Sequence, residues 1–178
     1  MIVITDAMLG ESRDRADAIM ANLKPTDNYT GVSEEDRFFH GLLGEFTSRE
    51  WFMTHGIHGN HRLSLSGESQ ACEFIIKPPH SPSFRLDAKA STKQSYRYAM
   101  MPLSQKIDFD VLWAVRLDLH AGMAEMMGFA FRDEVERWPV RMFKTMTRHA
   151  DYSTLRTPTE FIEFVHGGVD RENARCAI

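Results

Sequence analysis

Residues 84–92 read FRLDAKAST, and this stretch decides the fold that we predict. Apolar residues alternate with other residues along it, which is typical of a strand with one face on a hydrophobic core. Residues i and i+2 of a strand project to the same face, so Asp87 and Lys89 lie side by side while Leu86 and Ala88 point the opposite way. A solvated strand face carrying an ion pair would give the same local pattern, so the neighbouring segments decide between packing and chemistry.

A second apolar stretch precedes this strand. Residues 71–77, ACEFIIK, read as a strand, and the proline-rich turn PPHSPS joins them to the first stretch. If the two strands pair, Glu73 lies beside Asp87. Two carboxylates and the backbone carbonyl of Ala88 then form an oxygen-rich pocket suited to Mg²⁺ or Mn²⁺. Beside it, Lys89 can orient or deprotonate a water, and the ion can neutralise a phosphate under attack, which are the parts that phosphodiester hydrolysis needs.

Helical and strand patterns alternate along the rest of the chain. A capping-box arrangement at Ser33 opens the longest predicted helix, and residues 55–70 read as a loop. Gly128 lies inside a predicted strand and marks a bulge or a close approach of another segment. We predict helices at 9–24, 33–54, 94–106 (interrupted near Pro102), 133–138 and 157–167, and further strands at 110–119 and 123–132.

This order of elements predicts an α/β protein in which a central mixed β-sheet is flanked by α-helices. The length of 178 residues is that of a single domain covering residues 1–178. We expect its core at about 33–138, with an N-terminal helix and a C-terminal helical extension.

Composition excludes some classes of protein and leaves others open. The net charge of −4 argues against a protein whose whole surface coats nucleic acid, but it allows a local basic groove. Cys72 and Cys176 form no disulfide framework and no CxxC zinc signature. The first apolar run is too short for a signal peptide, and no stretch reaches the roughly 18 to 20 apolar residues of a membrane span. We therefore expect a reducing, cytoplasmic setting and no membrane partner.

Residues 72–91, CEFIIKPPHSPSFRLDAKAS, resemble the split motif of the PD-(D/E)xK nuclease superfamily, which has the restriction-endonuclease-like fold. In that family an acid on one strand is followed by a hairpin, and the next strand carries acid-any-lysine. Glu73 matches the first acid, and residues 87–89 match the second element. The first acid is Glu preceded by Cys72, where the family more often has Pro-Asp, and Glu68 is a competing candidate for this position.

Two flanking segments extend the resemblance over residues 36–137. Residues 41–52, GLLGEFTSREWF, resemble the first core helix of the family, which often holds a metal-binding glutamate, and Glu45 is the matching position. Residues 108–135 are similar to the strand-turn-strand that follows the active site. The resemblance implies a Mg²⁺-dependent deoxyribonuclease, most simply an endonuclease, in which Mn²⁺ can replace Mg²⁺. It implies four catalytic residues, Glu73, Asp87, Lys89 and Glu45, and four metal ligands, Glu73, Asp87, Ala88 (through its carbonyl) and Glu45.

DNA is the partner that this resemblance implies, and cutting a duplex would favour a homodimer. Candidate contacts to the phosphate backbone, for which ordinary surface residues are the competing interpretation, flank the hairpin or follow the lysine: Lys77, Arg85, Ser91, Lys93 and Gln94. His80 is a weaker candidate beside Lys77. A zinc site at His55, His58 and His61 is disfavoured by the intervening glycines and the lack of a nearby cysteine. The alternative function is a catalytically inactive module of the same fold that binds nucleic acid or a protein partner.

Overall fold

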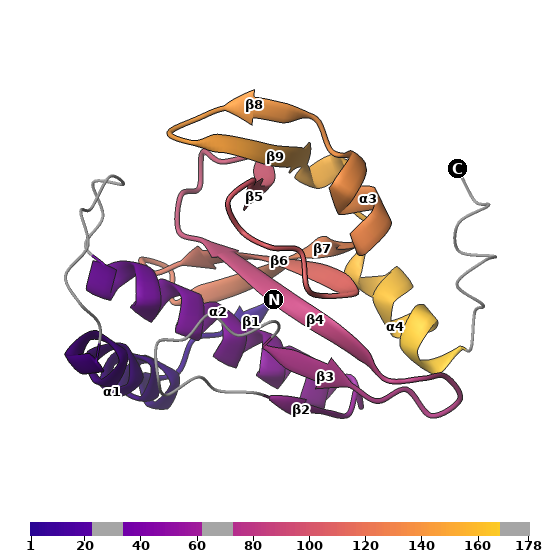
Figure 1. Cartoon of the computed structure of the whole chain (residues 1–178). Coiled ribbons are helices and arrows are strands. Elements are labelled where there is room, and N and C mark those ends of the chain that lie inside the picture. The colour runs from indigo at the N-terminus through magenta and orange to yellow at the C-terminus, as the bar shows by residue number, and fades with distance from the viewer. Residues whose placement is uncertain (23–33, 62–72, 168–178) are drawn as a thin grey trace.

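The computed structural model describes residues 1–22, 34–61 and 73–167. The stretch FRLDAKAS forms strand β4 (Phe84–Ser91), which lies inside a six-stranded sheet. β4 runs parallel to its neighbour β6 (Val111–Asp118), and the other neighbouring strands of this sheet are antiparallel. The chain is therefore a mixed α/β protein with a central mixed sheet, as expected, and helices flank that sheet (Figure 1).

The strands form two sheets. Across the larger sheet the order is β1 (Ile2–Val3), β7 (Met123–Phe131), β6, β4, β3 (Phe74–Ile76) and β2 (Gly59–His61). Across the smaller sheet, called the second sheet below, the order is β5 (Tyr98–Pro102), β9 (Met146–Asp151) and β8 (Val140–Met142). The chain enters the second sheet on its way from β4 to β6, so β5 belongs to the crossover between the two parallel strands.

The described helices lie on both sides of the larger sheet. α1 (Asp6–Asn22), α2 (Glu34–Thr54) and α4 (Pro158–His166) pack on one face, and α3 (Arg132–Arg137) lies on the side of the second sheet (Figure 1). α4 begins where the sequence places it, because the Thr157 hydroxyl accepts from the Glu160 backbone N–H in a capping box. A short 3₁₀ turn, η1 (Tyr152–Thr154), precedes α4.

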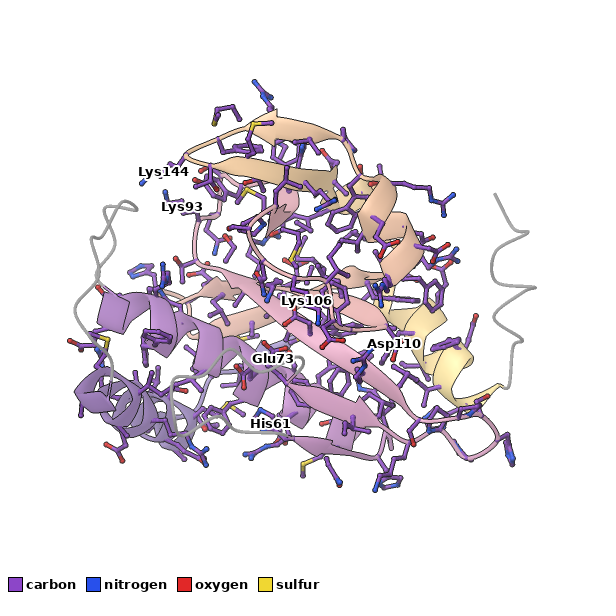
Figure 2. All side chains as sticks on the ribbon, viewed as in Figure 1. His61, Glu73, Lys93, Lys106, Asp110 and Lys144 are labelled. Atoms are coloured by element: carbon purple, nitrogen blue, oxygen red, sulfur yellow. The ribbon has the colours of Figure 1, made fainter. Side chains whose placement is uncertain are left out.

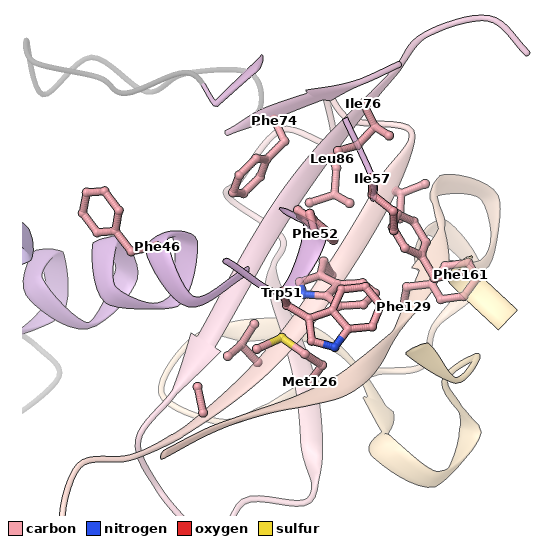
Figure 3. Packing of buried hydrophobic residues seen from close by; sticks show 14 of the residues in the cluster. Phe46, Trp51, Phe52, Ile57, Phe74, Ile76, Leu86, Met126, Phe129 and Phe161 are labelled. Atoms are coloured by element: carbon pink, nitrogen blue, oxygen red, sulfur yellow. The ribbon is translucent and has the colours of Figure 1, made fainter. Parts of the chain in front are cut away.

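The main hydrophobic core lies between the larger sheet and the α2 and α4 helices. Residues of α2 at helical spacing, including Leu42, Leu43 and Phe46, face the sheet and are buried. The ring of Trp113 in β6 lies 5.0 Å from that of Trp51 and 4.9 Å from that of Phe161. Figure 3 shows part of this cluster, including Trp51 and Phe161. The aromatic packing fixes the position of α2 on the sheet.

A second hydrophobic cluster covers the opposite face of the larger sheet. Leu112 and Ala114 of β6 pack there against Ala99 and Met101 of β5 and against Val135 of α3. β6 is thus buried on both faces, as its continuous apolar run predicts. The face of β4 that carries Asp87 and Lys89 looks toward this second layer, because these two residues pair in register with Leu112 and Ala114.

Three predictions of secondary structure are wrong. Residues 98–102 form a strand and not part of a helix, because Ala99 and Met101 alternate with less buried neighbours and pair with β9. Pro102 is tolerated because β5 is an edge strand. Residues 59–61 of the expected loop form β2, since they pair with β3. The C-terminal region contains strands β8 and β9 before its helix, and β8 has no buried face from which a strand could be read.

The structure confirms that Gly128 lies at a bulge and at a close approach of another segment. Its φ is +137°, and the register of β6 and β7 shifts next to it. An added Cβ at this position would lie 2.4 Å from the carbonyl oxygen of Arg156. The backbone N–H of Phe129 donates to that same oxygen at 2.9 Å, so the glycine lets the segment before α4 dock on β7.

Within the described residues, no helix is long and apolar enough to span a bilayer.

Gly44 tests the close packing of α2 on β4. A Cβ added at Gly44 would lie 2.5 Å from the Ala90 Cβ, whereas one added at Gly41 of the same helix would meet nothing within 4 Å. We expect Gly44→Ala to lower the free energy of unfolding by about 1 to 3 kcal/mol through overpacking. We expect Gly41→Ala to raise it by up to about 1 kcal/mol through helix propensity. Urea unfolding of the two variants measures the difference, and equal effects would contradict the α2–β4 contact.

Candidate active site

Glu73 and Asp87 lie next to each other on neighbouring strands. Phe74 pairs with Leu86, so the residue before β3 comes opposite Asp87, and the Glu73 backbone N–H donates to the Leu86 carbonyl at 3.2 Å. The two carboxyl groups are close enough for the charge of Asp87 to raise the pKa of Glu73, and the Asp87 side chain is only 4% exposed. The structure thus brings together the two acids that the sequence pairs.

The Glu73 carboxylate is also held by the backbone of β4. Its Oε2 atom accepts from the Ala88 N–H at 2.8 Å. Within the described residues β3 pairs with β4 only as far as Leu86, so Ala88 lies just beyond the paired part of that edge. The N–H and C=O of a strand residue point to the same side, and the Ala88 carbonyl therefore faces the edge where Glu73 lies.

Lys89 completes the cluster. Its Nζ atom lies 2.6 Å from Asp87 Oδ2, and a quarter of its side chain is exposed. Burial lowers the pKa of Lys89, but the charges of Asp87 and Glu73 outweigh burial and hold that pKa above its ordinary value. Lys89 is therefore an ammonium ion at neutral pH, and its expected role as a base for water does not fit the site as it stands.

Glu45 reaches the same region from α2. Its Oε2 atom lies 2.9 Å from Nε2 of His61 in β2, and both side chains are largely buried. The His61 ring stacks on Phe74, with 4.5 Å between ring centroids. His61 thus links the Glu45 carboxylate to β3, the strand that follows Glu73 (Figure 2 shows Glu73 and His61).

The carboxyl groups of this cluster are hard to ionise together. Burial raises the pKa of Glu73 well above its ordinary value, and the negative charge of Asp87 raises it further. Burial also raises the pKa of Glu45, although the hydrogen bond with His61 opposes this rise. If these acids ionise together, Lys89 alone does not balance their charge, so a bound cation would favour their ionised forms.

The donor set fits Mg²⁺ in its chemistry. Hard divalent cations prefer carboxylate and carbonyl oxygens, which Glu73, Asp87 and Ala88 supply. Within the described parts of the chain, no three His, Cys, Asp or Glu side chains converge as a ready-made metal site. The fit thus rests on two carboxylates and one backbone carbonyl, with Glu45 acting on Glu73 through its charge.

The predicted DNA contacts divide between the two ends of β4. At the start of the strand, Lys77 and His80 are exposed in the β3–β4 hairpin. Arg85 instead forms ion pairs with Asp108 and Asp110, so its guanidinium is already engaged. Arg85 shares a face of β4 with Asp87, two positions further along, but its side chain contacts Asp108 and Asp110 instead.

At the other end of β4, Ser91 accepts from the Lys93 backbone N–H at 3.3 Å. Lys93 is exposed, and its Nζ atom lies 3.3 Å from the Tyr96 hydroxyl. Gln94 donates to the Leu117 carbonyl of β6 at 3.2 Å. Of these three residues Lys93 is the one that carries a charge, and it is exposed.

His61 is the functional candidate that sequence reasoning missed. Its spacing to His55 and His58 suggested only a zinc site, yet the three histidines separate. His55 stacks on Trp51 and contacts the Trp51 carbonyl, and His58 is exposed. No sequence signal links His61 to Glu45, because the link depends on β2 pairing with β3.

The competing acid Glu68 and both cysteines, Cys72 and Cys176, lie outside the described residues, as does Ser33 of the predicted capping box.

Comparison of the chain with family models, curated proteins and solved structures finds no match.

Replacing Glu73 by Gln tests the buried carboxyl. A carboxyl whose pKa is raised by folding contributes stability below its unfolded pKa, and that contribution is lost as the pH rises through the folded pKa. Wild type should therefore lose this stability as the pH rises above the ordinary glutamate value of 4.5. Gln keeps a donor for Asp87 and an acceptor for Ala88 without ionising. We expect Glu73→Gln to be more stable than wild type at pH 8, and the gap to narrow toward pH 5.

Thermal melting in EDTA across this pH range measures the gap. A difference that stays constant with pH, or a variant that is less stable at pH 8, would contradict the raised pKa of Glu73.

Proposed function

We propose that this protein is a Mg²⁺-dependent deoxyribonuclease of the PD-(D/E)xK type, an endonuclease that hydrolyses phosphodiester bonds. The observation that carries the proposal is the cluster of Glu73, Asp87 and Lys89 on neighbouring strands. Two neighbouring acids that resist ionising together, with an ammonium group 2.6 Å from one of them, suit an ion and a phosphate together.

The arrangement of elements supports a restriction-endonuclease-like fold. The acid before β3, the hairpin and the acid-any-lysine of β4 follow one another in the order of the family motif. α2 packs on β4 at Gly44 and Ala90, next to the position of Glu45. β6 and β7 follow as an antiparallel pair joined by a turn, in which the Asp118 side chain accepts from the Ala121 N–H.

Glu73, Asp87 and the Ala88 carbonyl would hold the ion, and Glu45 would add negative charge near it. When bound, Mg²⁺ lowers the pKa of a coordinated water and neutralises charge on the attacked phosphate. The Ala88 N–H keeps the Glu73 carboxylate in place through its 2.8 Å hydrogen bond. The protein thus supplies a preorganised oxygen site on a rigid strand.

Lys89 would act as a fixed positive charge. As an ammonium ion beside Asp87, it can donate to the attacking water and to the phosphate oxygens, where charge develops in the transition state. This differs from removing a proton from the water. One such site cuts one strand, so we propose that duplex cleavage uses a homodimer.

The first test of this function is cleavage of plasmid and single-stranded DNA with Mg²⁺ or Mn²⁺. We expect wild type to cut and Lys89→Ala to lose about 100- to 1,000-fold in rate, the typical effect of removing one electrostatic contact to a transition state. Lys106→Ala is the control, because it removes the same charge from a side chain that is 86% exposed. Circular dichroism checks that each variant is folded.

Equal rates for wild type and Lys89→Ala would rule out the proposed role of this lysine. A wild type that cuts no DNA with either ion would leave the catalytically inactive module as the better description.

Metal binding gives a second test that does not depend on activity. A ligand that binds only the folded state stabilises it, so Mg²⁺ should raise the melting temperature of wild type. At a Mg²⁺ concentration of 100 times Kd, the free energy of unfolding should increase by about 2.7 kcal/mol. The increase should be larger at pH 8 than at pH 5, since the carboxyl groups must lose their protons to bind. Glu73→Gln and Asp87→Asn should lose the increase. An equal increase in both variants would place the ion elsewhere.

A further inference from the structure

The second sheet and the segments next to it are rich in basic residues, and the acid within its strands is Asp151 at the end of β9. Residues 90–105 and 138–150, which include β5, β8 and most of β9, contain no Asp or Glu. The same segments contain five basic residues, Lys93, Arg97, Arg141, Lys144 and Arg148. The chain as a whole has a net charge of −4, so these two segments differ from the rest of the chain in carrying an excess of positive charge.

One face of the second sheet carries a cluster of rings, here called the hairpin patch: Tyr98, Arg141, Phe143 and His149. The Phe143 ring lies 5.4 Å from the His149 ring and 6.3 Å from the Tyr98 ring. The guanidinium carbon of Arg141 lies 5.8 Å from the centre of the Phe143 ring. Arg141 pairs with Thr147, so the alternation along β9 places His149 on the same face.

The hairpin patch is partly open to solvent. Phe143 is 38% exposed and Arg141 is exposed, whereas Tyr98 and His149 are half-buried. Across the described residues, no carboxylate forms an ion pair with Arg141. An exposed ring beside this positive charge fits a partner that is both aromatic and anionic.

We propose that the hairpin patch binds single-stranded DNA. Arg141 and the neighbouring Lys144 would contact backbone phosphates, and one base would stack on the Phe143 ring. Single-stranded nucleic acid is the occupant that the charge and the rings favour together, because the face of an unpaired base can stack on a side chain while that of a paired base is covered. This inference rests on the proposed function for the identity of the polymer, and it specifies the form in which the strand is held.

The hairpin patch and the carboxylates lie on connected parts of the fold. Asp87 and Lys89 project toward the second layer, and the chain leaves β4 at Ser91 and passes Lys93 on its way to β5. The Lys93 ammonium lies 4.9 Å from the centre of the Tyr96 ring. Figure 2 shows Lys93 and Lys144 at the same end of the second sheet. Ala99, Met101 and Ala150 face the larger sheet, so the hairpin patch lies on the outer face of the second sheet. A strand held there would pass the end of the second sheet near Lys93 to reach the cluster of Glu73, Asp87 and Lys89.

Binding is measured by fluorescence anisotropy of labelled oligothymidine with the full chain in EDTA, where a metal-dependent nuclease does not cut. We expect Phe143→Ala to weaken binding about 5- to 100-fold, the usual effect of losing one stacked base. Phe143→Tyr should restore binding because it keeps the ring. Arg141→Gln should reduce the slope of log affinity against log salt by about 0.7, the value for one phosphate of a single strand.

The chain provides a matched control on α2. Arg37 lies 5.7 Å from the ring of Phe38, much as Arg141 lies over Phe143, but on the opposite face of the larger sheet. Arg37→Gln removes the same charge and should leave binding unchanged. Melting temperatures of all variants show that the chain remains folded.

Several outcomes would overturn this proposal. Equal affinity of wild type and Phe143→Ala would exclude stacking on this ring, and an equal loss in Arg37→Gln would indicate a general charge effect. Absence of oligothymidine binding combined with a dimer that Phe143→Ala dissociates would assign the hairpin patch to a second copy of this chain.

The outcomes separate the hairpin patch from the proposed catalysis. Binding that depends on Phe143 in a protein that cuts nothing would support the hairpin patch and reject the nuclease. Mg²⁺-dependent cutting by a protein whose binding ignores Phe143 would support the nuclease and reject the hairpin patch.

Discussion

The contact between the Glu73 and Asp87 carboxyl groups is the constraint on which the candidate site depends. Asp87 is buried and Glu73 is partly buried, and placing two acids together in such surroundings costs free energy unless other groups compensate. Lys89 offsets part of the negative charge, and the Ala88 N–H satisfies one oxygen of Glu73. The rest of the structure keeps these groups together although their charges repel.

The packing of α2 and the aromatic core supplies that restraint. Gly44 lets α2 approach β4 closely, and the rings of Trp51, Trp113 and Phe161 fix the helix against the sheet. Glu45 follows Gly44 directly, so the same close contact that excludes a Cβ also brings a third acid toward the site. The second hydrophobic cluster covers the opposite face of β6, so β6 is buried on both faces and gives β4 a rigid neighbouring strand. Rigid support of this kind is what a preorganised ionic site needs.

The parts of the fold that could be predicted are those with a local signal of period or spacing. The alternation of residues 84–92 predicted β4, the apolar run predicted β6 as a central strand, and Gly128 predicted a close approach. The position of Glu73 beside Asp87 followed from a hairpin between neighbouring strands. In these cases one short segment contained all the information that the inference required.

The features that could not be predicted depend on pairing between distant segments. β5 became a strand because it pairs with β9, about fifty residues further along the chain, and β8 is exposed along its length. His61 meets Glu45 only because β2 adds to the edge of the sheet at β3.

The parallel pairing of β4 with β6, which are separated in the sequence, has a consequence during synthesis of the chain. All residues of the carboxylate cluster have been synthesised once Lys89 is in the chain. β4 can pair with β6 only after residue 118 has been added, and β6 can pair with β7 only after β7 has been synthesised. The acids therefore exist for some time in an incomplete chain without the burial that raises their pKa, so their mutual repulsion arises as the last strands of the sheet close.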